Sequence, residues 1–183
     1  MLPALRINLS LQRYGKSFTD DFIFLAKSNE LKHKYHHYRA IYTEVLDRVA
    51  AAGVSQHFEC QVRLPDSASI FTAELHALKM AMDLVKASSK HHFIIFSDSL
   101  SSLVALHGHH QNHPYIIELR EDYSRLVHMH KLVVLAWVPS HVGIPANERA
   151  DILAKEALNM NVEDLNIHSL HRLEEQDKYL HKK

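Results

Sequence analysis

The sequence predicts an α/β fold, with a mixed five-stranded sheet flanked by helices. Residues 58–64 alternate apolar and polar side chains, which is typical of a strand with one buried face. Residues 92–97 and 131–138 are short apolar runs, the pattern of strands buried on both faces. Each of these runs is followed by a stretch with helical features. Strands separated by helices imply parallel neighbours and right-handed crossovers.

The remaining elements follow from the periodicity of apolar residues and from the residues that cap or end helices and strands. The expected strands cover residues 40–43, 49–56, 58–64, 92–97 and 131–138. The expected helices cover residues 67–86, 98–107, 115–130 and 146–159. Short connections between the first three strands predict an antiparallel meander. Ser67 or Ser69 can cap the first helix, and Gly108 ends the second.

The length of 183 residues suits one domain with flanking segments. We expect the domain at residues 38–160. Residues 1–37 show no sustained period and are interpreted as a linker, and residues 161–183 as a charged C-terminal tail. No apolar run approaches the ~18 residues of a membrane span, so no membrane partner is expected.

Composition narrows the class of function. The formal net charge is +0, which argues mildly against a dedicated nucleic-acid-binding module, since such modules neutralise phosphates with basic side chains. A single cysteine, Cys60, excludes a disulfide framework and predicts an intracellular protein, in the nucleus or the cytoplasm. The 17 histidines suggest zinc, but no further cysteine accompanies them, so surface decoration is the favoured interpretation.

Acidic side chains fall where a core is expected. Glu74 lies beside the apolar stripe of its helix, Asp98 follows the strand at 92–97, and Asp151 faces inward on the last helix. Singly, a rim position near a helix start explains Glu74 and Asp151, and helix capping explains Asp98. Together they predict a cluster of like charges that a cation must stabilise. Oxygen ligands select Mg²⁺ or Mn²⁺, and two such ions ~4 Å apart are a standard means of phosphodiester cleavage.

Three segments of the sequence resemble the ribonuclease H domains of non-LTR retrotransposons. They are residues 69–78, residues 93–102 and the long run 137–151, which is the most specific of the three. They occur in the order of that family and at similar separations, and the resemblance covers about residues 38–158. It implies the ribonuclease H-like fold, whose mixed five-stranded sheet agrees with the elements expected above.

The resemblance also implies an activity, endonucleolytic hydrolysis of the RNA strand of RNA–DNA hybrids by paired Mg²⁺ or Mn²⁺ ions, without a small-molecule cofactor. The catalytic, metal-binding carboxylates carry over as Glu44, Glu74, Asp98 and Asp151. The mobile loop histidine, associated with proton transfer or product release, carries over as His141. The implied partners are an RNA–DNA hybrid and, within a larger polyprotein, a reverse transcriptase whose remnant would be residues 1–37.

The first carboxylate departs from the family pattern. The first strand of the family ends in Thr-Asp-Gly-Ser, whereas this chain reads Thr43-Glu44-Val45. Glu is one methylene longer than Asp, and catalytic groups need placement within ~0.5 Å. Reduced or absent activity is therefore predicted. A catalytically inactive nucleic-acid-binding remnant stays open as an alternative function, as does a transposase or integrase of the same fold, against which the motif at 137–151 argues.

Overall fold

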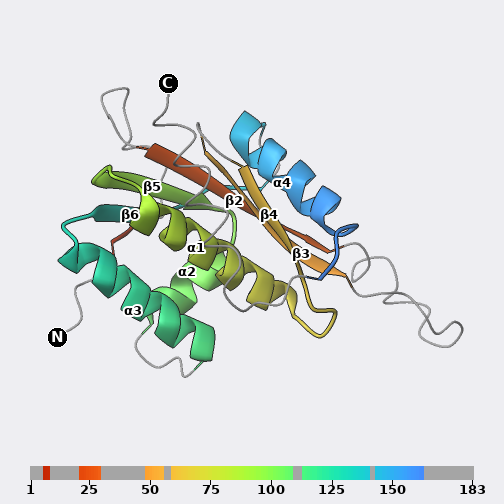
Figure 1. Cartoon of the computed structure of the whole chain (residues 1–183), viewed down its shortest axis with the longest axis horizontal. Coiled ribbons are helices and arrows are strands. Elements are labelled where there is room, and N and C mark those ends of the chain that lie inside the picture. The colour runs from red at the N-terminus through yellow and green to blue at the C-terminus, as the bar shows by residue number, and fades with distance from the viewer. Residues whose placement is uncertain are drawn as a thin grey trace, which may run out of the picture.

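The computed structural model describes residues 6–8, 21–29, 48–55, 59–108, 113–140 and 143–162. A mixed sheet of six strands has the order β1-β6-β5-β2-β3-β4 (Figure 1). Its strands are β1 (Ile7–Asn8), β2 (Asp21–Asn29), β3 (Val49–Ser55), β4 (Glu59–Leu64), β5 (His92–Ser97) and β6 (Leu132–Trp137). The helices are α1 (Ile70–Ala87), α2 (Leu100–His107), α3 (Pro114–His128) and α4 (Pro145–Ala157).

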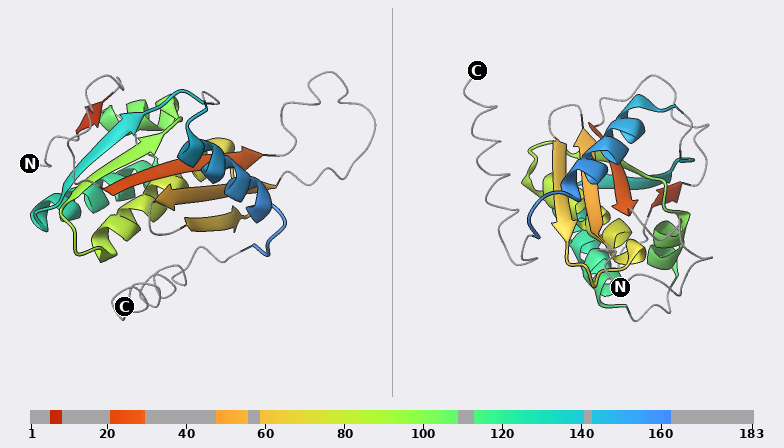
Figure 2. Two further views of the ribbon diagram at one scale, coloured as in Figure 1. Left: turned by 90° about the horizontal axis from the view of Figure 1, so that it is seen from above. Right: turned by 90° about the vertical axis from the view of Figure 1, so that its right-hand side faces the viewer.

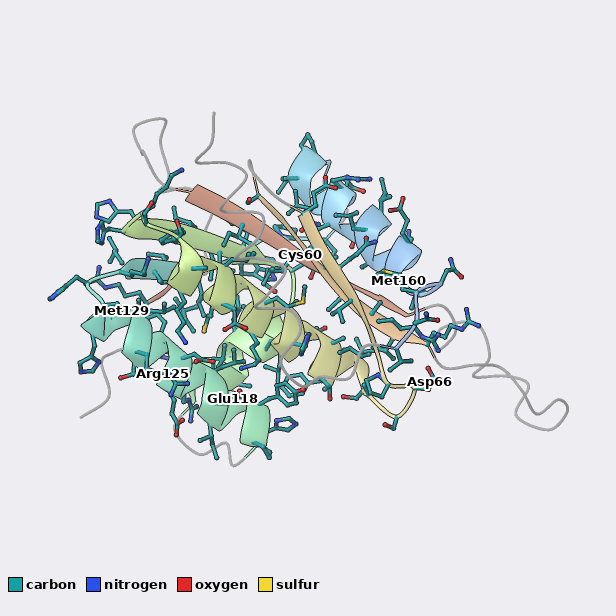
Figure 3. All side chains as sticks on the ribbon, in the orientation of Figure 1. Cys60, Asp66, Glu118, Arg125, Met129 and Met160 are labelled. Atoms are coloured by element: carbon teal, nitrogen blue, oxygen red, sulfur yellow. The ribbon has the colours of Figure 1, made fainter. Side chains whose placement is uncertain are left out.

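Helices cover both faces of the sheet. Figure 2 shows α4 on one face and α1 and α3 on the other. Strand β3 alternates accordingly, since Ala51 packs in the main core together with residues of α1, while Ala52 packs with Ala150 and Ala154 of α4. Between α1 and α3, Lys79 forms ion pairs with Asp122 and with Glu118, which is labelled in Figure 3.

Strand β2 lies in the middle of the sheet. It pairs antiparallel with β3 along residues 23–29 and parallel with β5 along residues 21–25. Ile23 is 1% exposed and Leu25 is 2% exposed, because helices α1 and α4 both pack on this strand. The other edge of β3 is paired with β4, and the other edge of β5 with β6. Both neighbours of β2 are therefore paired on two sides.

The structure corrects the expected start of the domain. The sequence predicts a linker over residues 1–37, but β1 and β2 both lie in this segment and make the sheet six-stranded instead of five-stranded. The strand expected at residues 40–43 falls outside the described residues, and its expected place beside β3 is occupied by β2. The physical reason is the apolar run at 22–26, which suits a strand buried on both faces as well as the run at 93–96 does.

The later elements agree with the sequence prediction to within three residues at their ends. Ser69 is the N-cap of α1, Gly108 follows the last residue of α2, and β5 has the predicted bounds. The expected C-terminal tail lies outside the described residues from position 163 onward. None of the helices in the described ranges is long and apolar enough to cross a membrane.

Candidate active site

Helix α1 carries Glu74 on its buried face, with 7% of the residue exposed. Its carboxylate oxygen Oε2 accepts hydrogen bonds from the hydroxyls of Ser99, Ser101 and Ser102 in and before the first turn of α2. The oxygen–oxygen distance is 2.8 Å for Ser102 and 3.3 Å for Ser101. A buried carboxylate needs such donors because it has lost its water. The inward position predicted for Glu74 is confirmed, whereas the serines were not expected.

The serine contacts follow from how α2 begins. Ser99 is the N-cap of α2, and its hydroxyl accepts a hydrogen bond from the backbone N–H of Ser102 at 3.3 Å. Its own N–H donates to Oγ of Ser97 at the end of β5. The cap thus fixes α2 to β5 and directs serine hydroxyls toward α1. Capping by Asp98, the simpler explanation of that residue, is wrong because the adjacent serine fills the role. The sequence signal that could have indicated these hydroxyl donors is the presence of serine at three of the four positions 99–102.

Asp98 lies half-buried between β5 and α2. Its Oδ2 accepts a hydrogen bond from the Ser140 hydroxyl at 2.8 Å, and its backbone carbonyl accepts one from Nε1 of Trp137 at 3.2 Å. These contacts attach the segment after β6 to the carboxyl end of β5. The residue after Ser140 is His141, which lies outside the described residues, as does Glu44.

Asp151 approaches the sheet from the face opposite to α1. It is half-buried in α4, whose Ala150 and Ala154 pack against Ala52 of β3. The inward orientation expected for this turn of the helix is therefore consistent with the packing of its neighbours. The three described acids come from α1, from the end of β5 and from α4.

Two residues beyond Glu74, the ring of His76 lies against Tyr115 of α3, with 6.3 Å between the ring centroids. Burial, together with a smaller contribution from Lys79, lowers the pKa of His76 to about 4, while Glu118 opposes the shift. The imidazole is therefore neutral at physiological pH, and its contacts assign it to the packing of α1 on α3.

The donor set does not match the metal pair that the resemblance implies. No group of three or more His, Cys, Asp or Glu side chains in the described part of the chain is placed to hold a metal ion. At the carboxyl end of β5, Leu25 of β2 pairs with Ser97, so the residue level with Asp98 on the central strand is Ala26. Strand β2, which occupies the place expected for residues 40–43, therefore brings no acidic residue among its described positions to this edge.

The RNase H family model matches residues 43–159, which is more than half of the chain. The match spans β3 through α4 and includes Glu74, Asp98 and Asp151, whereas β1 and β2 lie upstream of it. No curated protein gave a match. The mixed α/β architecture, with four helices in the described ranges, is consistent with the fold of this family. On the length of that match, the chain belongs to the RNase H family.

Proposed function

We propose that this chain hydrolyses the RNA strand of RNA–DNA hybrids, with activity reduced by an incomplete donor set. The family supports the reaction class. The observation that carries the proposal is the contact between Glu74 and Ser99, which directly follows Asp98. Two acids distant in sequence thereby come from different elements to the carboxyl end of β5, where open α/β sheets bind ligands.

The residues around these acids favour a catalytic use. Phosphodiester hydrolysis needs an activated water and stabilisation of the leaving oxygen, which paired divalent ions supply in two-metal enzymes. In this chain the α2 serines would orient Glu74 and Ser140 would orient Asp98, as hydrogen-bonding partners orient metal ligands in general. The RNA strand would be distinguished from DNA through its 2′-hydroxyls. The two-metal mechanism needs a further donor, which is why we propose reduced activity.

The second candidate is a nucleic-acid-binding remnant that has kept the fold without the chemistry. It is favoured by one observation, the lack of an acidic residue on β2 at the edge level with Asp98. Catalytic groups must be placed within ~0.5 Å, so a site that lacks a donor loses rate before it loses affinity.

A cleavage assay separates the two candidates. The purified chain is incubated with a labelled RNA–DNA hybrid and Mg²⁺ or Mn²⁺, beside the Asp98→Asn and Glu44→Asp variants, with duplex RNA and duplex DNA as substrate controls. We expect slow cleavage of the hybrid alone, lost in Asp98→Asn. Hybrid binding without cleavage by the unmodified chain would support the remnant, and cleavage that survives Asp98→Asn would refute the site.

We also propose an origin in a retroelement polyprotein, with a reverse transcriptase encoded upstream. The resemblance of residues 69–78, 93–102 and 137–151 to domains of non-LTR retrotransposons supports it. Expression in an intracellular, reducing compartment would fit the single cysteine among 183 residues.

A further inference from the structure

The central strand of the sheet comes from outside the segment that the family model matches. We propose that residues 21–29 are an integral part of the catalytic domain, and that position 26 is where the carboxylate of the central strand is missing. The part of this inference that concerns the carboxylate rests on the proposed function. The position of the strand in the sheet does not depend on that function.

Strand β2 is built into the core. It has hydrogen-bonded neighbours on both edges, β3 and β5. Ile23 and Leu25 belong to the main hydrophobic cluster, together with residues of α1. A strand held on two edges and two faces is a structural part of the sheet and not an appendage to it.

Position 26 lies at the same edge of the sheet as Asp98. Because Leu25 pairs with Ser97 in a parallel ladder, the next position along β2 is level with Asp98. Ala26 also pairs directly with Ala52 of β3. Opposed residues of an antiparallel pair lie on the same face of the sheet, and Ala52 packs against α4. Position 26 therefore shares an edge with Asp98 and a face with the helix that carries Asp151.

Position 26 is an alanine. Alanine offers no donor atom, so this position contributes nothing to a metal site, in agreement with the absence of a three-residue donor group in the described ranges. A carboxylate here would add an acid at the level of Asp98, on the face of the sheet that is covered by the helix of Asp151, and clustered carboxylates are stabilised by Mg²⁺ or Mn²⁺. The chain would then regain a donor from its central strand.

Glu44 is the residue to which the sequence prediction assigned the first carboxylate. A strand ending at Glu44 would need the place between β3 and β5, and both strands already pair with β2 on that side. The two segments therefore exclude each other from the same position in the sheet. If residues 21–29 hold this position, a substitution at 26 affects the site. If the segment that ends at Glu44 holds it, a substitution at 44 does.

The position of β2 is tested by disulfide formation in the full-length chain with Cys60→Ala. Opposed residues of an antiparallel pair have Cα atoms about 4.5–5.5 Å apart, within disulfide range. We expect Ala26→Cys with Ala52→Cys to cross-link on mild oxidation, and Ile23→Cys with Ser55→Cys to do so at the other end of β2. Ala26→Cys with Ala51→Cys, whose side chains belong on opposite faces, is the control. Failure of both opposed pairs, or cross-linking of Ile41→Cys with Ala52→Cys instead, would overturn the inference.

The missing carboxylate is tested by Ala26→Asp, with the isosteric and uncharged Ala26→Asn as control. We expect Mg²⁺ to raise the Tm of Ala26→Asp in a concentration-dependent way and to leave Ala26→Asn unchanged, because only the former adds a ligand. Hybrid cleavage by Ala26→Asp should exceed that of the unmodified chain. If the opposed cysteine pairs cross-link and Mg²⁺ stabilises Ala26→Asp, but this variant does not cleave the hybrid, the proposed function is refuted and the inference about β2 stands. Equal responses of the two variants to Mg²⁺, or a gain of cleavage in Glu44→Asp only, would refute the assignment of position 26.

Discussion

Serine hydroxyls from the start of α2 replace water around the buried carboxylate of Glu74. For single residues, the sequence indicated that Glu74 points inward, because helical spacing alone fixes which side chains share a face. It did not indicate the donors, since their approach depends on how α2 packs beside α1. The roles of Glu44 and His141 stay predictions, because both residues lie outside the described ranges.

Ser102→Ala should lower the free energy of unfolding by about 1–3 kcal/mol, the cost of removing a donor from a buried acceptor. Ser102 is 0% exposed and donates to Glu74 at 2.8 Å. Urea denaturation measures the change. The matched control is Ser101→Ala, since Ser101 is exposed and 3.3 Å away, and its cost should stay within about 0.5 kcal/mol. Equal losses in the two variants would contradict the assigned role of Ser102.

Cys60, labelled in Figure 3, should react slowly with thiol reagents in the folded chain. Burial raises the pKa of its thiol to about 11, so the reactive thiolate is a minor species at pH 8. Because the pKa is raised, reactivity should increase steadily with pH up to about 11 and should become ordinary in urea. Absorbance detection of a disulfide-exchange reagent follows the reaction. A native rate at pH 8 equal to the rate in urea would show that Cys60 is accessible.

Among the elements, those with strong local signals were predicted and the central strand was not. Helix α1 combines a serine cap with an apolar stripe, and β5 is a compact apolar run between polar residues. Strand β2 also contains an apolar run, at 22–26, but it lies in a segment without further periodicity. Strands buried on both faces do not alternate, so only their tertiary partners distinguish them from a stray apolar run.

The C-terminus of α2 depends on a side chain of α3. The guanidinium of Arg120 donates to the carbonyls of Ala105 at 3.0 Å and Leu106 at 3.1 Å, and also to that of Gly108. The last carbonyls of a helix have no intrahelical partner, and a planar donor can satisfy several of them at once.

Arg120→Ala should therefore lower the free energy of unfolding by about 2 kcal/mol, a magnitude typical of hydrogen bonds made by charged groups. Arg120→Lys should recover little of this loss, because an ammonium group lacks the planar arrangement of donors. Urea denaturation measures the loss of free energy of unfolding in both variants. Full stability in Arg120→Lys would mean that charge alone, and not the geometry of the donors, holds α2.

For the whole molecule, the domain as predicted from the sequence omits its own central strand. The expected domain begins at residue 38 and the family match at residue 43, whereas β2 ends at Asn29. A chain beginning at residue 38 would leave β3 and β5 without a common neighbour and would remove Ile23 and Leu25 from the core.

We expect such a truncated chain to lose cooperative thermal unfolding, as followed by far-UV circular dichroism. A chain beginning at residue 18, which keeps β2 and removes only β1 and the residues around it, is the control and should still unfold cooperatively. Unchanged cooperativity and Tm in the chain that begins at residue 38 would show that the family-matched segment folds alone.

The order of strands in the sheet also bears on how the polypeptide matures on the ribosome. Residues 21–29 are made well before their parallel partner, which ends only at Ser97, and β1 pairs with Leu135 and Ala136 of β6. Pairings of such long sequence separation form late and slowly. The apolar run at 22–26 must therefore await its parallel neighbour β5 while translation continues, and during that interval it is a natural target for chaperones and for aggregation.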